Sequence, residues 1–327
     1  MPLSTAFASR CLTALQLAVV LATAGVPLPG RAASVAVAPA APTTALGRAR
    51  AAFATTVSLP PTREPHPPKD PTGAFSLVTY PSPVGALPAY LTKDPKDGRR
   101  HPAIVWITGG DYTSIGEMWT PSPRDNDQSA ASYRRAGIVT MFPSLRGGND
   151  NPGHREAFYG EVDDILAAAD FLARQPWVDP ERIYLGGHST GGTIALLTAE
   201  QTARFRAVFA LGPVHAAWYY GADFVGVDLK KLPDHREDEL RAPWRWLDDV
   251  SRRTFVIEGT GGNIEPLRFM QKQNRNSQLR FVEIRGATHF DAIAATNDVI
   301  AQKILHDDGG ATSGIEVSGD EIAAKMR

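Results

Sequence analysis

Continuous apolar runs alternate with helix-like stretches through most of this 327-residue chain. The runs that read as strands with little polar character lie at residues 103–108, 137–142, 182–187, 208–211 and 254–257. Strands that are apolar on both faces are typical of parallel sheets covered by helices on both sides. Residues 159–174, between two of these runs, carry apolar side chains at helical spacing. The alternation therefore predicts an α/β fold with a doubly wound, mostly parallel sheet and helices on both faces.

The remaining expected elements complete one folded domain over residues 73–308. Strands are expected at residues 74–80 and 86–92, at the start of the domain, and at 279–284, near its end. Further helices are expected over residues 193–203, 265–274 and 292–306.

The two ends of the chain have a different character. Arg10 precedes an apolar run over residues 11–24 and small residues near 30–34, a pattern typical of a secretory signal peptide over residues 1–33. The run is shorter than the ~20 residues that a spanning helix needs, although an uncleaved anchor is the alternative. Residues 34–72 are rich in Ala and Pro and are predicted to be a disordered linker. Residues 309–327 are predicted to be a flexible tail, and the protein is expected to be periplasmic or secreted.

The formal net charge is −1 and no run of Lys and Arg interrupts it, so nucleic acid is not an expected partner. Stable membrane insertion is not expected either. Cys11 is the only cysteine and lies within the predicted signal peptide, which leaves the mature chain without disulfides or thiol chemistry. The chain has neither a His-Glu-x-x-His motif nor a phosphate-binding loop, so no metal and no cofactor are expected.

Residues 187–191 read Gly-His-Ser-Thr-Gly and lie between a predicted strand and a predicted helix. A nucleophile at such a bend adopts a strained backbone that exposes its oxygen, and crowding there accepts only very small neighbours. The following helix directs free backbone N–H groups at a developing oxyanion. Ser189 is therefore the candidate nucleophile, and the N–H of Thr190 is the first candidate oxyanion donor.

A serine hydroxyl needs a base to take its proton, and histidine performs that role at neutral pH. In a strand–turn–helix architecture of this kind the base follows the last strand of the sheet. His289 occupies that position, five residues after the strand at 279–284. The other histidines lie in the predicted linker, before a strand, on the elbow itself, at a helix end or in loops. His289 is the candidate general base.

The elbow and three other stretches resemble the catalytic domain of the prolyl oligopeptidase family and its dienelactone-hydrolase-like relatives, within the α/β-hydrolase superfamily. The stretches are Glu-Val-Asp-Asp-Ile at 161–165, Val-Asp-Pro-Glu-Arg-Ile at 178–183 and Pro-Ser-Leu-Arg-Gly-Gly at 143–148. The resemblance covers residues 73–306. It implies an α/β-hydrolase fold with a small cap insertion and a serine–histidine–acid triad.

The triad acid is the point where the chain departs from these relatives. They place an aspartate after the seventh strand, at a position that falls here on Gly262 or Asn263. Glu258, at the end of that strand, is our first choice for the acid. Glu265, Asp223 and an amide in the acid's place at Asn263 are left open.

The resemblance also suggests where an acyl substrate would lie. Relatives carry a His-Gly-Gly-type turn after the third strand, and the matching turn here makes Gly110 the candidate second oxyanion donor. Segments 111–127 and 213–250 are expected to cover the site, and their aromatic residues would form either a substrate pocket or the small core of a cap. The candidate substrate-binding residues are Asp111, Tyr112, Trp218 and Tyr219.

These observations predict a serine hydrolase that acts through an acyl-enzyme. Its substrate is expected to be a small-molecule ester, or else an amide or a short peptide. The alternative is a catalytically impaired binding protein built on the same fold, which the absent aspartate favours. The presence of both Ser189 and His289 favours the enzyme.

Overall fold

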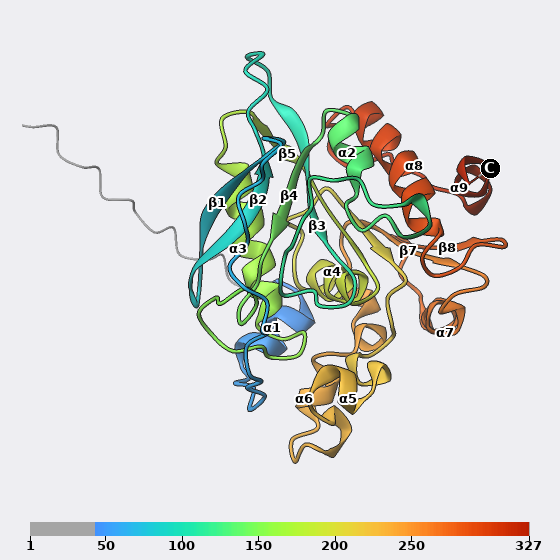
Figure 1. Ribbon diagram of the computed structural model, residues 1–327. Coiled ribbons are helices and arrows are strands. Elements are labelled where there is room, and N and C mark those ends of the chain that lie inside the picture. The colour runs from blue at the N-terminus through green and yellow to red at the C-terminus, as the bar shows by residue number, and fades with distance from the viewer. Residues whose placement is uncertain (1–42, 327) are drawn as a thin grey trace, which may run out of the picture. The chain divides into compact units, whose positions relative to one another are not determined.

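The computed structural model describes residues 43–326 and contains an eight-stranded sheet at its centre (Figure 1). The strand order is β1-β2-β4-β3-β5-β6-β7-β8. The pairs β1–β2 and β2–β4 are antiparallel, and every other pair is parallel. The predicted doubly wound, mostly parallel sheet is therefore confirmed. The strands are β1 (Phe75–Ser82), β2 (Gly85–Thr92), β3 (His101–Ile107), β4 (Val139–Pro143), β5 (Val178–His188), β6 (Ala207–Leu211), β7 (Arg253–Gly259) and β8 (Leu279–Ile284).

Helices cover both faces of this sheet (Figure 1). One face packs against α1 (Ala45–Ala51), α3 (Glu161–Ala173), α4 (Thr190–Gln201) and α7 (Ile264–Gln273). The other packs against α2 (Ala131–Arg135), α8 (Ala292–His306) and α9 (Gly319–Lys325). Alternate side chains of β3 enter the two cores, with Val105 on the first face and Trp106 on the second. Within residues 43–326, no helix combines the length and apolarity needed to span a bilayer.

A cap of short helices connects β6 to β7. It contains a 3-10 turn at Ala217–Tyr220 followed by α5 (Ala222–Val225) and α6 (Arg236–Glu239). Figure 1 shows α5 and α6 at one end of the molecule, beyond the sheet. Trp244 and Trp246 pack against the core that also holds α3 and α4, so part of the cap's aromatic content is structural.

The prediction of a disordered linker over residues 34–72 is wrong for residues 43–72. These residues form α1 and an ordered segment that packs on the domain, with Leu46 fully buried. Leu59 is also buried and forms an antiparallel bridge with Arg155. The low apolar content misled the prediction, because a few apolar anchors and hydrogen bonds hold the segment. Residues 1–42, including the predicted signal peptide, lie outside the described residues.

The prediction of a flexible tail over residues 309–327 is wrong for its described part, residues 309–326. The capping box of Ser318 and Glu321 starts α9, and Ile322 is fully buried against the face that holds α8. Ile315 and Val317 are buried before the helix begins. The Ser-x-x-Glu pattern and these spaced apolar residues were the overlooked signals.

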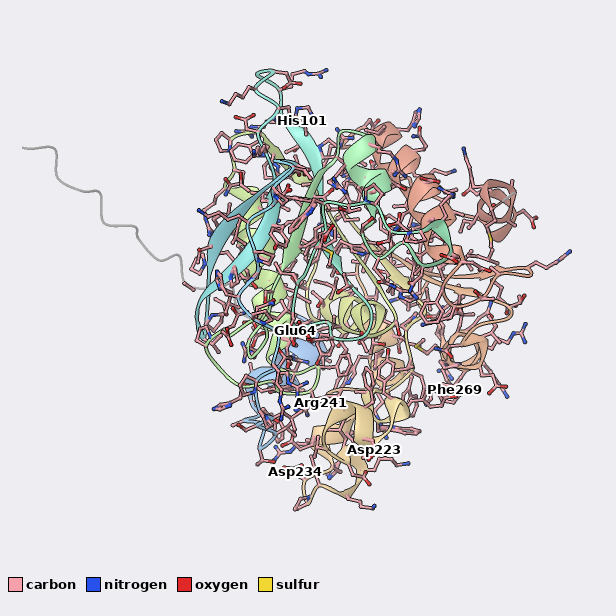
Figure 2. The ribbon with its side chains drawn as sticks, in the orientation of Figure 1. Glu64, His101, Asp223, Asp234, Arg241 and Phe269 are labelled. Carbon is pink, nitrogen blue, oxygen red and sulfur yellow. The ribbon has the colours of Figure 1, made fainter. Side chains whose placement is uncertain are left out.

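A buried ion pair joins the N-terminal segment, the cap and the loop before α3. Arg241 Nη1 lies 2.7 Å from Glu237 Oε2, and neither side chain is exposed. Arg241 also donates to the carbonyl oxygens of Glu156 and Ala157, while the Thr55 hydroxyl donates to Glu237. Figure 2 labels Arg241, which follows α6 in the cap. Because the guanidinium and the carboxylate both have further hydrogen-bond partners, the ion pair is tolerated in the interior.

Replacing Glu237 by Leu leaves the Arg241 guanidinium buried without its counterion. We expect the free energy of unfolding in urea to fall by about 3–5 kcal/mol. Asp234→Asn, which removes a partner from the exposed pair with Arg236, is the matched control and should cost less than about 1 kcal/mol. Equal losses in the two variants would contradict the role given to the buried pair.

Candidate active site

Ser189 lies at the junction of β5 and α4, with φ 56° and ψ −114°. This backbone conformation is strained for a residue with a side chain and persists only where the surroundings impose it. The Ser189 N–H donates to the carbonyl oxygen of Leu211 (2.7 Å), and the Ser189 carbonyl accepts from the Thr193 N–H (2.8 Å). The turn predicted from the sequence is present, and these two hydrogen bonds fix the backbone of Ser189.

Close packing explains the glycines around this serine. A Cβ on Gly191 would collide with the carbonyl oxygens of Ile107 and Thr108 at the end of β3. A Cβ on Gly187 would collide with the carbonyl of Gly191. The elbow therefore requires glycine at both positions, as the sequence pattern indicates.

His289 and Glu258 meet at the same edge of the sheet. The distance between His289 Nδ1 and Glu258 Oε2 is 2.7 Å, and the side chain of Glu258 is only 2% exposed. The other oxygen of Glu258 accepts from the N–H of Gly259 (2.7 Å). The imidazole lies over the end of β6, where a Cβ on Gly212 would be 2.5 Å from its Cε1 atom. With Nδ1 engaged by the carboxylate, Nε2 is left for proton transfer.

The space for the expected aspartate is filled by Glu258. A Cβ on Gly262 would lie 2.5 Å from Glu258 Oε1 and 2.7 Å from the His289 backbone nitrogen. A side chain at position 262 and the Glu258 carboxylate therefore exclude each other. The other candidate acids, Asp223, Glu265 and Asn263, are exposed. Figure 2 shows Asp223 out in the cap.

The two candidate oxyanion donors lie on turns that contact each other. The Thr190 hydroxyl donates to the carbonyl oxygen of Gly110 (3.0 Å), which ties the elbow to the turn after β3. Among residues 43–326, neither the Thr190 N–H nor the Gly110 N–H has a hydrogen-bond acceptor. Two free N–H groups on adjoining turns are what an oxyanion site needs.

His188 and Gln128, which the sequence analysis did not select, connect the turn after β3 to the loop of His289. Gln128 accepts from the Gly109 N–H (3.0 Å) and donates to His188 Nδ1 (2.9 Å). His188 Nε2 in turn donates to the His289 carbonyl oxygen (2.9 Å). Burial lowers the pKa of His188 to about 3, and the neighbouring His289 ring adds to this effect. His188 therefore remains neutral and keeps both hydrogen bonds at physiological pH.

Tyr220 is a second residue that the sequence analysis did not select. Its hydroxyl lies 2.8 Å from the Thr193 hydroxyl. Burial raises the pKa of Tyr220, and interactions with the Thr193 and Ser189 hydroxyls partly offset that rise. No sequence motif distinguishes it from the other aromatic residues of the cap.

A pocket of about 150 Å³ adjoins the turn after β3, and Gly110, Asp111 and Tyr112 line it. Trp218 and Tyr219 do not line this pocket. Their rings pack around His215, at centroid distances of 5.3 and 4.9 Å. Of the four candidate substrate-binding residues, the structure thus brings two to the pocket. Among residues 43–326, no three His, Cys, Asp or Glu side chains gather into a metal-binding group.

The sheet order and the elbow at the carboxyl end of β5 define the chain as an α/β-hydrolase-fold protein. Residues 125–262 match the model of the prolyl oligopeptidase family, which confirms the predicted relationship. The chain therefore has the α/β-hydrolase fold and carries, over residues 125–262, a segment similar to the prolyl oligopeptidase family.

Several known proteins are similar to the chain. Dipeptidyl-peptidase 5 of Porphyromonas endodontalis is 25% identical over 169 residues, a match that covers 48% of this chain and 22% of the relative. The solved structure of a putative dipeptidyl aminopeptidase IV from Bacteroides ovatus superposes with a TM-score of 0.58 at 18% identity, covering 71% of this chain and 35% of that one. A Mycobacterium tuberculosis puromycin-hydrolyzing peptidase gives a TM-score of 0.57 at 20% identity, with coverage of 74% and 40%. The chain spans less than half the length of these proteins.

The depressed pKa of His188 predicts a stability that falls in acid. Between about pH 6.5 and pH 3 the unfolded chain binds a proton at His188 and the folded chain does not, so the folded state loses stability as the pH falls. From pH 7.5 to 5.0, the wild type should lose about 2 kcal/mol more unfolding free energy than His188→Gln, measured in urea at each pH. Parallel losses in both proteins would contradict this origin.

Proposed function

We propose that the protein is a serine hydrolase that cleaves an ester, amide or short peptide bond through an acyl-enzyme on Ser189. The observation that carries the proposal is the 2.7 Å contact between the imidazole of His289 and the buried carboxylate of Glu258, at the sheet edge that presents Ser189. Such a contact holds the imidazole in the tautomer that can accept a proton from serine.

In the proposed mechanism Ser189 Oγ attacks the substrate carbonyl while His289 Nε2 takes the hydroxyl proton. The N–H groups of Thr190 and Gly110 stabilise the oxyanion of the tetrahedral intermediate. His289 then gives its proton to the leaving group, which departs and leaves an ester of Ser189. Water, activated by the same imidazole, releases the acid and restores the serine. Glu258 orients the imidazole and stabilises its charged form.

The relatives support a peptide or other amide as one substrate class. A dipeptidyl-peptidase and a puromycin-hydrolyzing peptidase are named among them. The same acyl-enzyme chemistry cleaves esters, whose better leaving groups need less assistance from proton transfer by His289. We therefore include both bond types in the proposal.

Ser189→Ala should abolish hydrolysis of p-nitrophenyl acetate and of aminoacyl p-nitroanilides, because the acyl group has no other acceptor. Ser251→Ala is the matched control, since Ser251 is exposed and lies just before the amino end of β7, away from the site. Release of p-nitrophenol or p-nitroaniline measures both. Undiminished turnover by folded Ser189→Ala protein would overturn the assignment of the nucleophile.

Glu258→Gln should lower kcat by up to about 10⁴-fold, because the amide no longer favours the productive tautomer of His289. Glu265→Gln, at an exposed position on α7, is the control and should retain full kcat. A loss of only a few-fold in Glu258→Gln, with folding intact, would point to another acid.

The second candidate function is a binding protein that has lost catalysis. The absence of the family's aspartate is the observation that favours it. The same two assays decide between them, because a folded wild-type protein that turns over neither substrate would support binding alone.

We also place the protein's action in the periplasm or outside the cell. The single positive charge of Arg10, followed by the short apolar run over residues 11–24, supports this proposal. N-terminal sequencing of the exported protein should find cleavage near residue 33. Retention of the whole chain in the cytoplasmic fraction would contradict it.

A further inference from the structure

The pocket beside the oxyanion turn is linked to the Ser189 elbow, because the carbonyl of Gly110 in its wall accepts from the Thr190 hydroxyl (3.0 Å). Gly110, a candidate oxyanion donor, forms part of its wall, as do Tyr112 and Phe158. The Phe158 ring stacks on Tyr112 at a centroid distance of 4.4 Å and on Tyr220 at 5.7 Å. The Tyr220 hydroxyl lies 2.8 Å from the Thr193 hydroxyl, and the Thr193 N–H donates to the Ser189 carbonyl (2.8 Å), so the aromatic stack reaches from the pocket to the elbow.

The backbone of this pocket is strained. Ala157 and Phe158 line it and have φ values of 53° and 71°, a region that residues with side chains rarely adopt. Arg241 Nε donates to the Ala157 carbonyl (2.8 Å), and the Phe158 N–H donates to the Tyr112 hydroxyl (2.9 Å). Strain that buried partners impose at a cavity is typical of a ligand site.

Arg155 supplies a positive charge to the same pocket. Its side chain packs over Gly147, where a Cβ would lie 2.8 Å from Arg155 Cγ, and its Nε donates to the carbonyl oxygen of Pro60 (2.8 Å). The backbone of Arg155 also accepts from the Leu59 N–H (2.9 Å). These contacts orient the guanidinium and leave its two terminal nitrogens without a partner among residues 43–326.

Within residues 43–326, neither neighbouring carboxylate forms an ion pair with Arg155. Glu156 pairs instead with Arg146, with 3.0 Å between Nη1 and Oε1. Asp111 also lines the pocket, but its Oδ1 accepts from the N–H (3.0 Å) and the hydroxyl (2.7 Å) of Thr113. The two charged residues lie on different loops. Asp111 follows Gly110 on the oxyanion turn, and Arg155 lies on the loop whose backbone pairs with Leu59. A free guanidinium with aromatic walls suits a carboxylate at the end of a short chain.

We infer that this pocket binds a short acyl or aminoacyl side chain of the substrate that ends in a carboxylate, and that Arg155 selects for it. The free volume of about 150 Å³ is below the ~300–1,000 Å³ of sites for drug-sized ligands, so it suits one side chain. The inference rests on the proposed hydrolysis at Ser189 for its substrate role. It also makes the N-terminal segment around Leu59 and Pro60 part of the binding site.

The test compares two esters of nearly the same shape that differ in charge, the p-nitrophenyl monoester of adipic acid and p-nitrophenyl adipamate, in which a carboxamide replaces the free carboxylate. The wild type should have a kcat/KM at least about tenfold higher for the free acid, the worth of one charge-assisted contact. Arg155→Gln should bring this ratio close to one, and Arg155→Lys should restore part of it. A wild-type ratio near one, or an unchanged ratio in Arg155→Gln, overturns the inference.

Arg252→Gln is the matched control. Like Arg155, Arg252 donates from Nε to a backbone carbonyl, that of Ala203 (3.3 Å), but it is exposed and lies at the amino end of β7. This variant should keep the wild-type ratio of the two kcat/KM values. If Arg252→Gln also lost the preference for the free acid, the selective role given to Arg155 would be contradicted.

Calorimetry with adipate separates the pocket from the proposed chemistry. Ser189→Ala protein should bind adipate, and the double variant with Arg155→Gln should bind it at least about tenfold more weakly. If the wild type cleaves neither ester, the hydrolase proposal fails, and this binding difference still decides the pocket. Equal binding by the two proteins overturns the inference.

Discussion

The close approach of the Ser189 turn to the ends of β3 and β6 is the constraint on which the rest of the site depends. The turn is possible only because Gly187 and Gly191 lack side chains where carbonyl oxygens approach. The same approach brings the elbow against the turn that contains Gly110, through the hydroxyl of Thr190. A parallel sheet assembles such a site because its strands end at a common edge, where the loops of distant segments meet.

Two further sets of contacts extend this geometry. His188 and Gln128 link the turn after β3 to the loop of His289, so the base and the oxyanion site are held relative to each other by neutral hydrogen bonds. The buried pair of Glu237 and Arg241 joins the cap, the N-terminal segment and the loop before α3. The cap, the N-terminal segment and the loop before α3 form much of the pocket wall. The cap therefore contributes to the site through this buried ion pair as well as through its aromatic residues.

The sheet and its principal helices were predictable because strands buried on both faces have a clear apolar pattern. Ser189 and His289 were predictable as candidates because the elbow and the loop after the last strand are local features. The identity of the acid was left open, since only the folded chain shows that Gly262 leaves room for the carboxylate of Glu258. Gln128, Arg155 and the order of residues 43–72 were missed because each depends on contacts across 60 residues or more. Composition and local spacing carry no record of such contacts.

The most direct test of the central claim is to identify the residue that a fluorophosphonate modifies, by peptide mass spectrometry. The account predicts a single adduct on the peptide that contains Ser189, formed by the wild type and absent after His289→Ala, because the hydroxyl reacts only when the imidazole takes its proton. A wild-type protein that stays unmodified, or that carries its adduct on another residue, would contradict the assignment of Ser189 as an activated nucleophile.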